Sequence, residues 1–442
     1  MKKILLCIAL VSNFAFSQND KSSDSKGTVG INPEYSYKML EPVYDLRKVE
    51  VFMDQRAAGA LDNKSLTIGA SIISIGDYQK SNIDSKFAYL MRHPTSSNQI
   101  GKEVSEAALH SFQLAFTAVI NNWMAGYAEI LYNPEQSFGT GTITDLNRNQ
   151  LQLRKGYVLI GDLNAFPLYG AIGKMDAPFG QMGGINPFTN TSTWHAFAGL
   201  CYGAQISFKK WDIHATVMAA QGGSQFRAMF TPVGDSTNVP SMVNNFTADL
   251  NYTVHFGENF HLNFGASYMH GTAYSHDFPV QHFQATSNRN PAYTFYGNLK
   301  YKERFELRGG YVKTLEVWEG THNPTPPLDI YAASKVSSYD AGGKINFNLD
   351  GKAVFALSGE FSNFTAGPDG APWQRQNQYI LGFSAMVNKS CKIFLEGFRT
   401  EGYVPLNWIS GSDPFAPFPP GTTHSSRDAI SHGIVIGAMI DI

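Results

Sequence analysis

The strongest constraint on this chain is an alternation of apolar and polar residues that begins at Ser65 and recurs to the C-terminus. The clearest segment, from Phe246 to Phe256, places apolar side chains at every even position and Thr, Asp, Asn, Thr and His between them. Successive side chains of a β-strand point to opposite sides of a sheet, so the pattern predicts strands with one apolar and one polar face. The segments are roughly 9 to 12 residues long, which is what a tilted strand needs to cross a bilayer.

The connections between these segments alternate between short and long. We identify about sixteen segments, an even number. Short joints include Lys209-Lys210, Gly257 to Asn259 and Leu349 to Gly351, whereas Gln221 to Asn245 and Glu401 to Ser431 are long and rich in turn residues. This asymmetry predicts an all-β fold, a transmembrane antiparallel up-and-down barrel of about sixteen strands with short periplasmic turns and long extracellular loops.

A soluble β-sandwich or β-propeller would also alternate, so we weighed both against the barrel. A propeller would show a repeat of roughly 40 to 50 residues, and we find none. Charged residues make up only 16% of the chain, against roughly 25% in soluble domains, and aromatic residues make up 13%. The last segment is alternately apolar from Ile434 to Ile442, although soluble chains tend to fray at their ends. These features favour a membrane barrel.

The N-terminus resembles an export signal. Lys2-Lys3 precede the apolar run from Ile4 to Val11, and Ala15-Phe16-Ser17 supply a small-x-small cleavage site. We therefore expect a signal peptide at residues 1–17, a periplasmic segment at 18–64 and a barrel at 65–442 in the outer membrane of a Gram-negative bacterium. For residues 18–64, helix and irregular structure both remain open, and the segment could enter the mouth of the barrel.

Residues 151–180 carry a more specific signal. They form a strand, a turn, a second strand and a Pro-Phe-Gly, and the residues that carry the pattern are Phe166, Pro167, Gly173, Lys174, Pro178, Phe179 and Gly180. The stretch resembles the LbtU-type siderophore porins, the family of the legiobactin receptor. The resemblance implies a barrel of about sixteen strands that passes an iron-siderophore complex without a large plug. The chain departs from the family in lacking sustained heptads before the barrel, and from most outer-membrane barrels in ending with Ile442 instead of Phe.

The period of two also predicts which charged residues face the lumen. Both signs occur, which favours a zwitterionic or weakly anionic solute over a phosphate channel lined by Lys and Arg. The alternative is that these charges pair across the wall and only hydrate the pore. The candidate lumen-lining residues are Arg154, Asp212, His214, Asp249, His255, Lys300, Glu306, Arg308, Asp340, Lys344, Glu360, Lys392 and Glu396.

Other residue types give weaker indications. His270, His276 and His282 fall in one predicted outer loop, where they either contact iron or copper or are simply solvated. Aromatic loop residues could stack on a siderophore or pack the loops together; they include Trp318, Trp373, Trp408 and Phe415 to Phe418. We find no Gly-x-Ser-x-Gly or comparable catalytic elbow, so we expect neither an enzyme nor a bound cofactor. The net charge of -2 argues against nucleic acid as a partner.

The sequence therefore predicts an outer-membrane porin, surrounded by lipid, for TonB-independent passage of a small polar solute, most concretely a siderophore or its iron complex. A general or substrate-selective porin of another family is the first alternative. A surface adhesin or a structural barrel is an alternative of another class. The sequence leaves the oligomeric state open.

Overall fold

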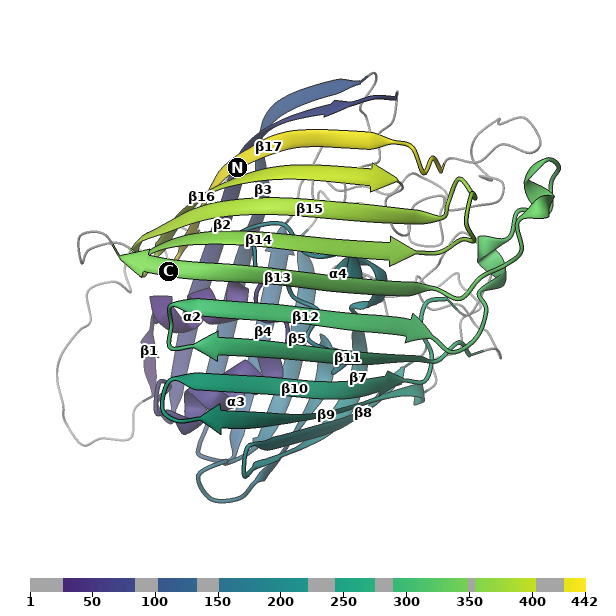
Figure 1. Cartoon of the computed structure of the whole chain (residues 1–442). Helices are drawn as coiled ribbons and strands as arrows, with labels where there is room; N and C mark the ends of the chain where they lie inside the picture. The colour runs from purple at the N-terminus through teal and green to yellow at the C-terminus, as the bar shows by residue number, and fades with distance from the viewer. Residues whose placement is uncertain are drawn as a thin grey trace.

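The computed structural model describes residues 27–83, 102–132, 151–221, 243–274, 289–348, 354–402 and 425–442. Sixteen antiparallel strands, β2 to β17, form one closed barrel (Figure 1). Each strand pairs with its neighbours in sequence, and β17 pairs with β2 to complete the ring. The all-β prediction of about sixteen strands is confirmed. The strands are β2 (Ser65–Ser81), β3 (Glu103–Val119), β4 (Met124–Tyr132), β5 (Gln152–Gly161), β6 (Leu168–Asp176), β7 (Leu200–Lys210), β8 (Ile213–Gln221), β9 (Val243–Phe256), β10 (Phe260–Met269), β11 (Ala292–Tyr301), β12 (Phe305–Thr314), β13 (Ser337–Asn348), β14 (Val354–Thr365), β15 (Arg375–Asn388), β16 (Cys391–Gly402) and β17 (Ile430–Asp441).

The last strand closes the barrel with its final residue. Ile440 lies opposite Ile72 of β2, and the backbone N–H of Ile442 donates to the carbonyl of Ala70 at 2.9 Å while the reverse bond has the same length. Pairing the terminal residue satisfies backbone groups that would be costly to leave unpaired in hydrocarbon. The closing strand therefore reaches its hydrogen-bonded register with Ile442 at its end.

The short turns lie at one end of the barrel, and the longer connections that the structure describes, such as residues 315–336 between β12 and β13, lie at the other (Figure 1). One predicted turn was wrong: Lys209 and Lys210 belong to β7, and the turn that follows consists of Trp211 and Asp212. Both turn residues have left-handed backbones, with φ of 55° and 62°, which is what a tight two-residue hairpin turn requires. The predicted turn at Leu349 to Gly351 lies outside the described residues.

The outer face of the barrel is apolar. Ile206, Leu250 and Leu381 are exposed by 56 to 70%, as expected for side chains that point away from the barrel axis. Exposed aromatic residues stand near both ends of this apolar band, where amphipathic rings settle at the two headgroup levels of a bilayer. Those near the short turns are Trp123, Trp211, Phe256 and Phe260, and those toward the long loops are Tyr78, Tyr202, Tyr311, Tyr339 and Tyr379.

Residues 27–64, which we call the N-terminal segment, lie inside the barrel near the short-turn end (Figure 1). The segment contains β1 (Thr28–Gly30), which pairs in parallel with the start of β2, and the helices α2 (Pro33–Leu40) and α3 (Lys48–Ala57). Asn32 caps α2 by accepting the Tyr35 N–H, and Pro33 occupies the first turn, where its missing N–H has no cost. In the described part of the chain, every helix is too short or too polar to span a bilayer.

Residues 177–199, which we call the inner loop, connect β6 to β7 and also lie inside the barrel. The loop ends in the short helix α4 (Ser192–Phe197), which contacts β12 to β15 on the far wall. Thr191 caps this helix by accepting the Trp194 N–H at 2.9 Å. Two single-turn 3-10 helices, η2 (Glu319–Thr321) and η3 (Leu328–Ile330), lie in the connection between β12 and β13. Two separate parts of the chain therefore occupy the lumen.

Candidate functional site in the barrel lumen

Tyr44, between α2 and α3, lies within a group of charged side chains from the wall. The Lys344 ammonium lies 4.4 Å from the centre of its ring, and Lys300 and Arg308 lie at 5.4 and 5.7 Å. Its hydroxyl donates to Glu306 at 2.9 Å. Positive groups are attracted to the electron-rich face of an aromatic ring, most strongly away from water. Burial raises the pKa of the Tyr44 hydroxyl, which keeps it protonated as a donor.

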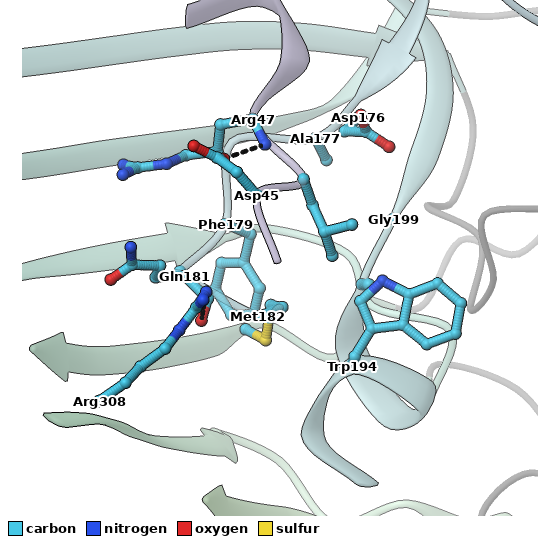
Figure 2. Close-up of a pocket in the computed structure, with 13 residues that line it drawn as sticks. Asp45, Arg47, Asp176, Ala177, Phe179, Gln181, Met182, Trp194, Gly199 and Arg308 are labelled. Atoms are coloured by element: carbon cyan, nitrogen blue, oxygen red, sulfur yellow. Dashed lines mark hydrogen bonds between the residues drawn. The ribbon is translucent and has the colours of Figure 1, made fainter. Parts of the chain in front are cut away.

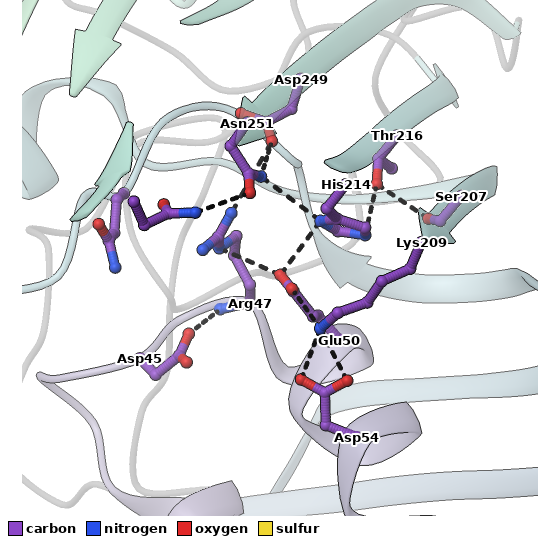
Figure 3. A network of polar contacts seen from close by, with 12 residues as sticks. Asp45, Arg47, Glu50, Asp54, Ser207, Lys209, His214, Thr216, Asp249 and Asn251 are labelled. Atoms are coloured by element: carbon purple, nitrogen blue, oxygen red, sulfur yellow. Dashed lines mark hydrogen bonds and ion pairs between the residues drawn. The ribbon is translucent and has the colours of Figure 1, made fainter. Parts of the chain in front are cut away.

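Helix α3 contacts the wall through a second charged group, shown in Figure 3. Lys209 on β7 donates to Glu50 at 3.0 Å and to Asp54 at 2.7 Å, and His214 on β8 lies 3.4 Å from Glu50. Burial alone would raise the pKa of Glu50, but Arg47, His214 and Lys209 more than offset it and lower the pKa to about 2. Glu50 is therefore ionised at neutral pH, and its charge stabilises the docked helix.

Asp249 on β9 extends this network across the wall. Its carboxylate accepts hydrogen bonds from Ser267 at 2.6 Å and Tyr296 at 2.8 Å. It also lies 3.8 Å from the Arg47 guanidinium, and both residues are labelled in Figure 3. The N-terminal segment is thus ion-paired with the wall from β7 to β9 and contacts charged groups on β11 to β13.

The opposite side of the N-terminal segment is apolar. Phe52 packs against Tyr35 and against Tyr127 of the wall, with ring centres 6.1 and 6.3 Å apart, and the Tyr35 hydroxyl lies 3.0 Å from that of Thr117. Burying these rings removes apolar surface from water and is favourable. The side chains that form this contact are Tyr35, Met39, Leu40, Phe52, Met53, Ala115, Val119, Tyr127 and Tyr157.

The inner loop is held in a different way, through its backbone. The Glu396 carboxylate on β16 accepts the N–H groups of Phe188 at 2.7 Å and Thr189 at 3.0 Å, and Glu360 on β14 accepts the Ile185 N–H at 2.9 Å. Both carboxyl groups are buried, and buried hydrogen bonds are not weakened by competition with water. The two predicted lumen residues therefore fix the loop against the far wall.

The two inserted parts of the chain meet near the barrel axis. Gly184 donates its N–H to the Val43 carbonyl at 3.0 Å. At Gly183, an added Cβ would come within 2.4 Å of the Val43 and Tyr44 carbonyl oxygens, so only glycine permits this approach. Arg308 donates to the Tyr44 and Gln181 carbonyls at 2.8 and 3.1 Å, which links both parts to β12.

A crevice remains between the N-terminal segment, the start of the inner loop and the wall (Figure 2). Arg47 and Arg308 line it together with the carboxylates of Asp45 and Asp176, and Trp194 of α4 closes one side. Its volume of about 20 Å³ accommodates about one water molecule. A second cavity of about 20 Å³ lies beside Glu50, His214 and Asp249. Both cavities are lined by side chains of both charge signs, such as Arg47 with Asp176 in the first and Arg47 with Glu50 in the second.

Twelve of the thirteen predicted lumen residues lie at inward-facing strand positions, and Asp212 lies in the turn between β7 and β8. Lys392 donates to the Pro187 carbonyl of the inner loop at 2.9 Å, and Arg154 pairs with Glu129 of β4 at 3.0 Å. Asp212, His255, Lys300 and Lys344 keep exposed or partly exposed side chains. The others are buried: Arg154, His214, Asp249, Glu306, Arg308, Asp340, Glu360, Lys392 and Glu396.

The motif residues of the predicted family extend from the turn before β6, along β6, to the start of the inner loop. Phe166 and Pro167 lie in the turn between β5 and β6, and Gly173 and Lys174 lie on β6. Pro178, Phe179 and Gly180 begin the inner loop, where the φ of 67° at Gly180 favours glycine. Only Pro178, Phe179 and Gly180 lie where the chain leaves the wall for the lumen.

The predicted loop contacts have mixed outcomes. Trp318 and Trp373 are buried, so they pack the loops together instead of offering a stacking surface. Trp408, Phe415 to Phe418, His276 and His282 lie outside the described residues, and the His270 ring stacks on Phe246. Among the residues that the structure describes, no three His, Cys, Asp or Glu side chains converge on one metal position.

The sequence did not identify Tyr44, Arg47 or Glu50 as lumen residues, and it did not identify the inner loop. The mixed charge of residues 35–56 was visible, but a short charged helix has the same appearance whether it packs inside a barrel or lies in water. The candidate lumen residues included most of the charged partners on the wall, such as Glu306 and Arg308, but not Lys209, which was predicted to lie in a turn. The contacts between the N-terminal segment and the wall could be identified only from the structure.

Comparisons with known proteins support the fold. No family model and no curated protein matches the chain. Among solved structures, the anion-selective porin from Comamonas acidovorans superposes with a TM-score of 0.50 at 11% identity, covering 86% of this chain and 99% of that chain. OprB of Pseudomonas putida has a TM-score of 0.50 at 8% identity, with 85% and 94% covered. At these identities the likeness shows a shared porin-type barrel fold.

Proposed function

We propose that this protein is an outer-membrane porin that allows passive passage of a small polar solute. The observation that carries the proposal is a closed barrel with an apolar outer face, a polar inner face and its long loops at one end. A lipid-facing outer wall places the protein in a membrane, and a polar lumen gives solutes a route that hydrocarbon denies them. The inner loop and the N-terminal segment narrow this route.

For the solute itself, we propose a siderophore or its iron complex. This rests on the resemblance of residues 151–180 to the LbtU-type siderophore porins, whose Pro-Phe-Gly at residues 178–180 begins the inner loop here. The mixed charge of the crevice around Arg47, Asp45 and Arg308 suits a zwitterionic or weakly anionic molecule. The crevice itself is far smaller than a siderophore.

One observation favours an alternative of another class. The N-terminal segment occupies the short-turn end of the lumen, which is what a structural barrel or surface adhesin with a plugged lumen would show. Planar-bilayer recordings of the purified full-length protein distinguish a porin from a plugged structural barrel or adhesin. A porin gives discrete conductance steps, and the absence of steps across a range of voltages would remove the channel proposal.

Growth under iron limitation tests the solute. A deletion strain should grow more slowly than its parent when a siderophore is the sole iron source, and the cloned gene should restore growth. If growth on the siderophore is unchanged while uptake of a simple sugar or amino acid falls, the protein is a porin of another specificity. That result would leave the channel proposal standing and remove the siderophore.

A further inference from the structure

Two histidines face each other at the short-turn end of the barrel. His255 on β9 and His261 on β10 occupy directly opposed positions in the antiparallel register, on the inward side of the wall. Their Nδ1 atoms lie 2.6 Å apart, and their ring planes are nearly perpendicular. Opposed residues of an antiparallel pair are held at a fixed separation by the ladder, so the two rings converge without help from a loop.

A carboxylate orients one of these rings. The Nε2 of His255 lies 3.0 Å from the Asp212 carboxylate, which can only accept, so His255 carries its proton on Nε2 and presents the lone pair of Nδ1 to His261. Asp212 reaches this position from a turn in which both residues, Trp211 and Asp212, have left-handed backbones.

We propose that His255 and His261 form a binding site for a divalent transition-metal ion, with Asp212 as the orienting carboxylate. Histidine ligands typically donate their second ring N–H to a carboxylate, which is the arrangement of Asp212 and His255. The metal takes the place of the proton between the two Nδ1 atoms, and His261 moves that proton to its own Nε2, so no net proton is lost.

The geometry requires only a small adjustment. Metal–nitrogen bonds of roughly 2.0 to 2.1 Å separate two nitrogens by about 3.3 Å in a tetrahedral site and by about 2.9 Å in the tetragonal geometry of copper(II), so the rings must part by about 0.3 to 0.7 Å. The side chains of Asp212 and His255 are each about half exposed, which leaves room for that movement and for water to complete the coordination. Lys300 lies opposite His261 on β11, but its ammonium is directed at the Tyr44 ring.

Copper(II) is the appropriate probe, because imidazole sites bind it most tightly among the divalent first-row metals. We expect the full-length protein, folded in detergent, to bind one Cu²⁺ at this site with micromolar affinity and to show nitrogen hyperfine splitting in its electron paramagnetic resonance spectrum. Calorimetry of His261→Ala and His261→Gln should show affinity at this site lowered by at least about tenfold. His432→Ala, which removes an exposed histidine from the outer side of β17, is the matched control.

Asp212→Asn distinguishes a metal site from a merely structural histidine pair. It keeps both nitrogen ligands, so nitrogen splitting should remain while affinity falls by roughly 10-fold or more. Each variant is compared only when its electrophoretic mobility is that of the folded barrel. Copper affinity and spectra that are the same in the wild type, His261→Gln and Asp212→Asn would overturn the proposal, and so would a wild-type protein that binds no copper.

Discussion

The two parts of the chain that occupy the lumen are attached by different chemistry. The inner loop is held mainly through its own backbone, because Glu396 and Glu360 accept N–H groups that any residue would supply. The N-terminal segment is held by side chains, through ion pairs such as Lys209–Asp54 and an apolar contact around Phe52. The first attachment depends on a few wall residues, whereas the second depends on the charges of the segment itself.

This difference bears on which part can move. Buried hydrogen bonds resist salt, and a buried N–H left without an acceptor is costly. Partly exposed ion pairs weaken when salt screens their charges and when acid protonates their carboxylates. We therefore infer that the inner loop is the fixed constriction of the lumen and that the charged side of the N-terminal segment is its adjustable part.

The largest expected effect is on the inner loop. Glu396→Gln keeps an oxygen for the N–H groups of Phe188 and Thr189, which both bind Oε1. It puts an NH2 donor where Oε2 accepts the Thr189 hydroxyl, at a cost of about 3 kcal/mol in loop attachment. Hydrogen exchange of these amides should accelerate on the order of 100-fold, because about 1.4 kcal/mol corresponds to a factor of ten.

Glu401→Gln is the matched control for this variant. Glu401 pairs at the end of the same strand with Arg399, whose side chain is exposed, so its loss should change exchange of the inner loop very little. Equal protection of Phe188 and Thr189 in the wild type and Glu396→Gln would show that the carboxylate does not hold the loop.

Acid should loosen the N-terminal segment next. The pKa of Glu50 is about 2 in the folded protein against an ordinary 4.5, so its ion pairs contribute fully above pH 4.5 and are lost as the pH falls from 4.5 toward 2. Since part of this site reaches water, we expect a loss of about 2 kcal/mol. Hydrogen exchange of α3, corrected for intrinsic rates, should report it, and Glu50→Gln should remove the pH dependence. An α3 signal with the same pH dependence in that variant would assign the transition to another group.

A smaller effect is expected at Lys209, whose side chain is 31% exposed. Lys209→Met keeps the length of the side chain and removes its pairs with Glu50 and Asp54, at a cost of about 1 kcal/mol. Urea titration of α3 protection at low salt should show the loss, which should shrink at high salt. Lys210→Met is the control, because Lys210 is the exposed neighbour that stacks on Trp211. If both variants weaken α3 equally, the effect comes from net charge and not from the ion pairs.

The wall could be predicted from the sequence because bilayer and strand geometry constrain each residue independently. The alternation of side chains along a strand assigned Glu306, Arg308 and Glu396 to the inward face without any knowledge of their partners. The turn after β7 was misplaced because Trp and Asp do not resemble the Asn-Gly pair that usually signals a two-residue turn. Here the left-handed backbone at Trp211 and Asp212 is apparent only in the structure.

The contents of the lumen could not be predicted for a different reason. Docking of the N-terminal segment depends on contacts such as Tyr44–Glu306, which join residues 262 positions apart, and no periodic pattern encodes such a pair. Gly183 illustrates the same limit, because its need for glycine arises from carbonyl oxygens of another segment. The motif at residues 178–180 marks where the inner loop begins but not which carboxylates receive it.

The smallest effect is expected where the N-terminal segment meets water. Lys389 lies 3.0 Å from Glu34, but their side chains are 80% and 56% exposed, so Lys389→Ala should change α2 protection by less than about 0.5 kcal/mol, and by less still at high salt. Burial, and not the number of ion pairs, should thus rank the contacts of this segment. A loss at Lys389 equal to that at Lys209 would contradict this ranking, because it would mean that exposed charges at the barrel mouth hold the segment as firmly as those inside.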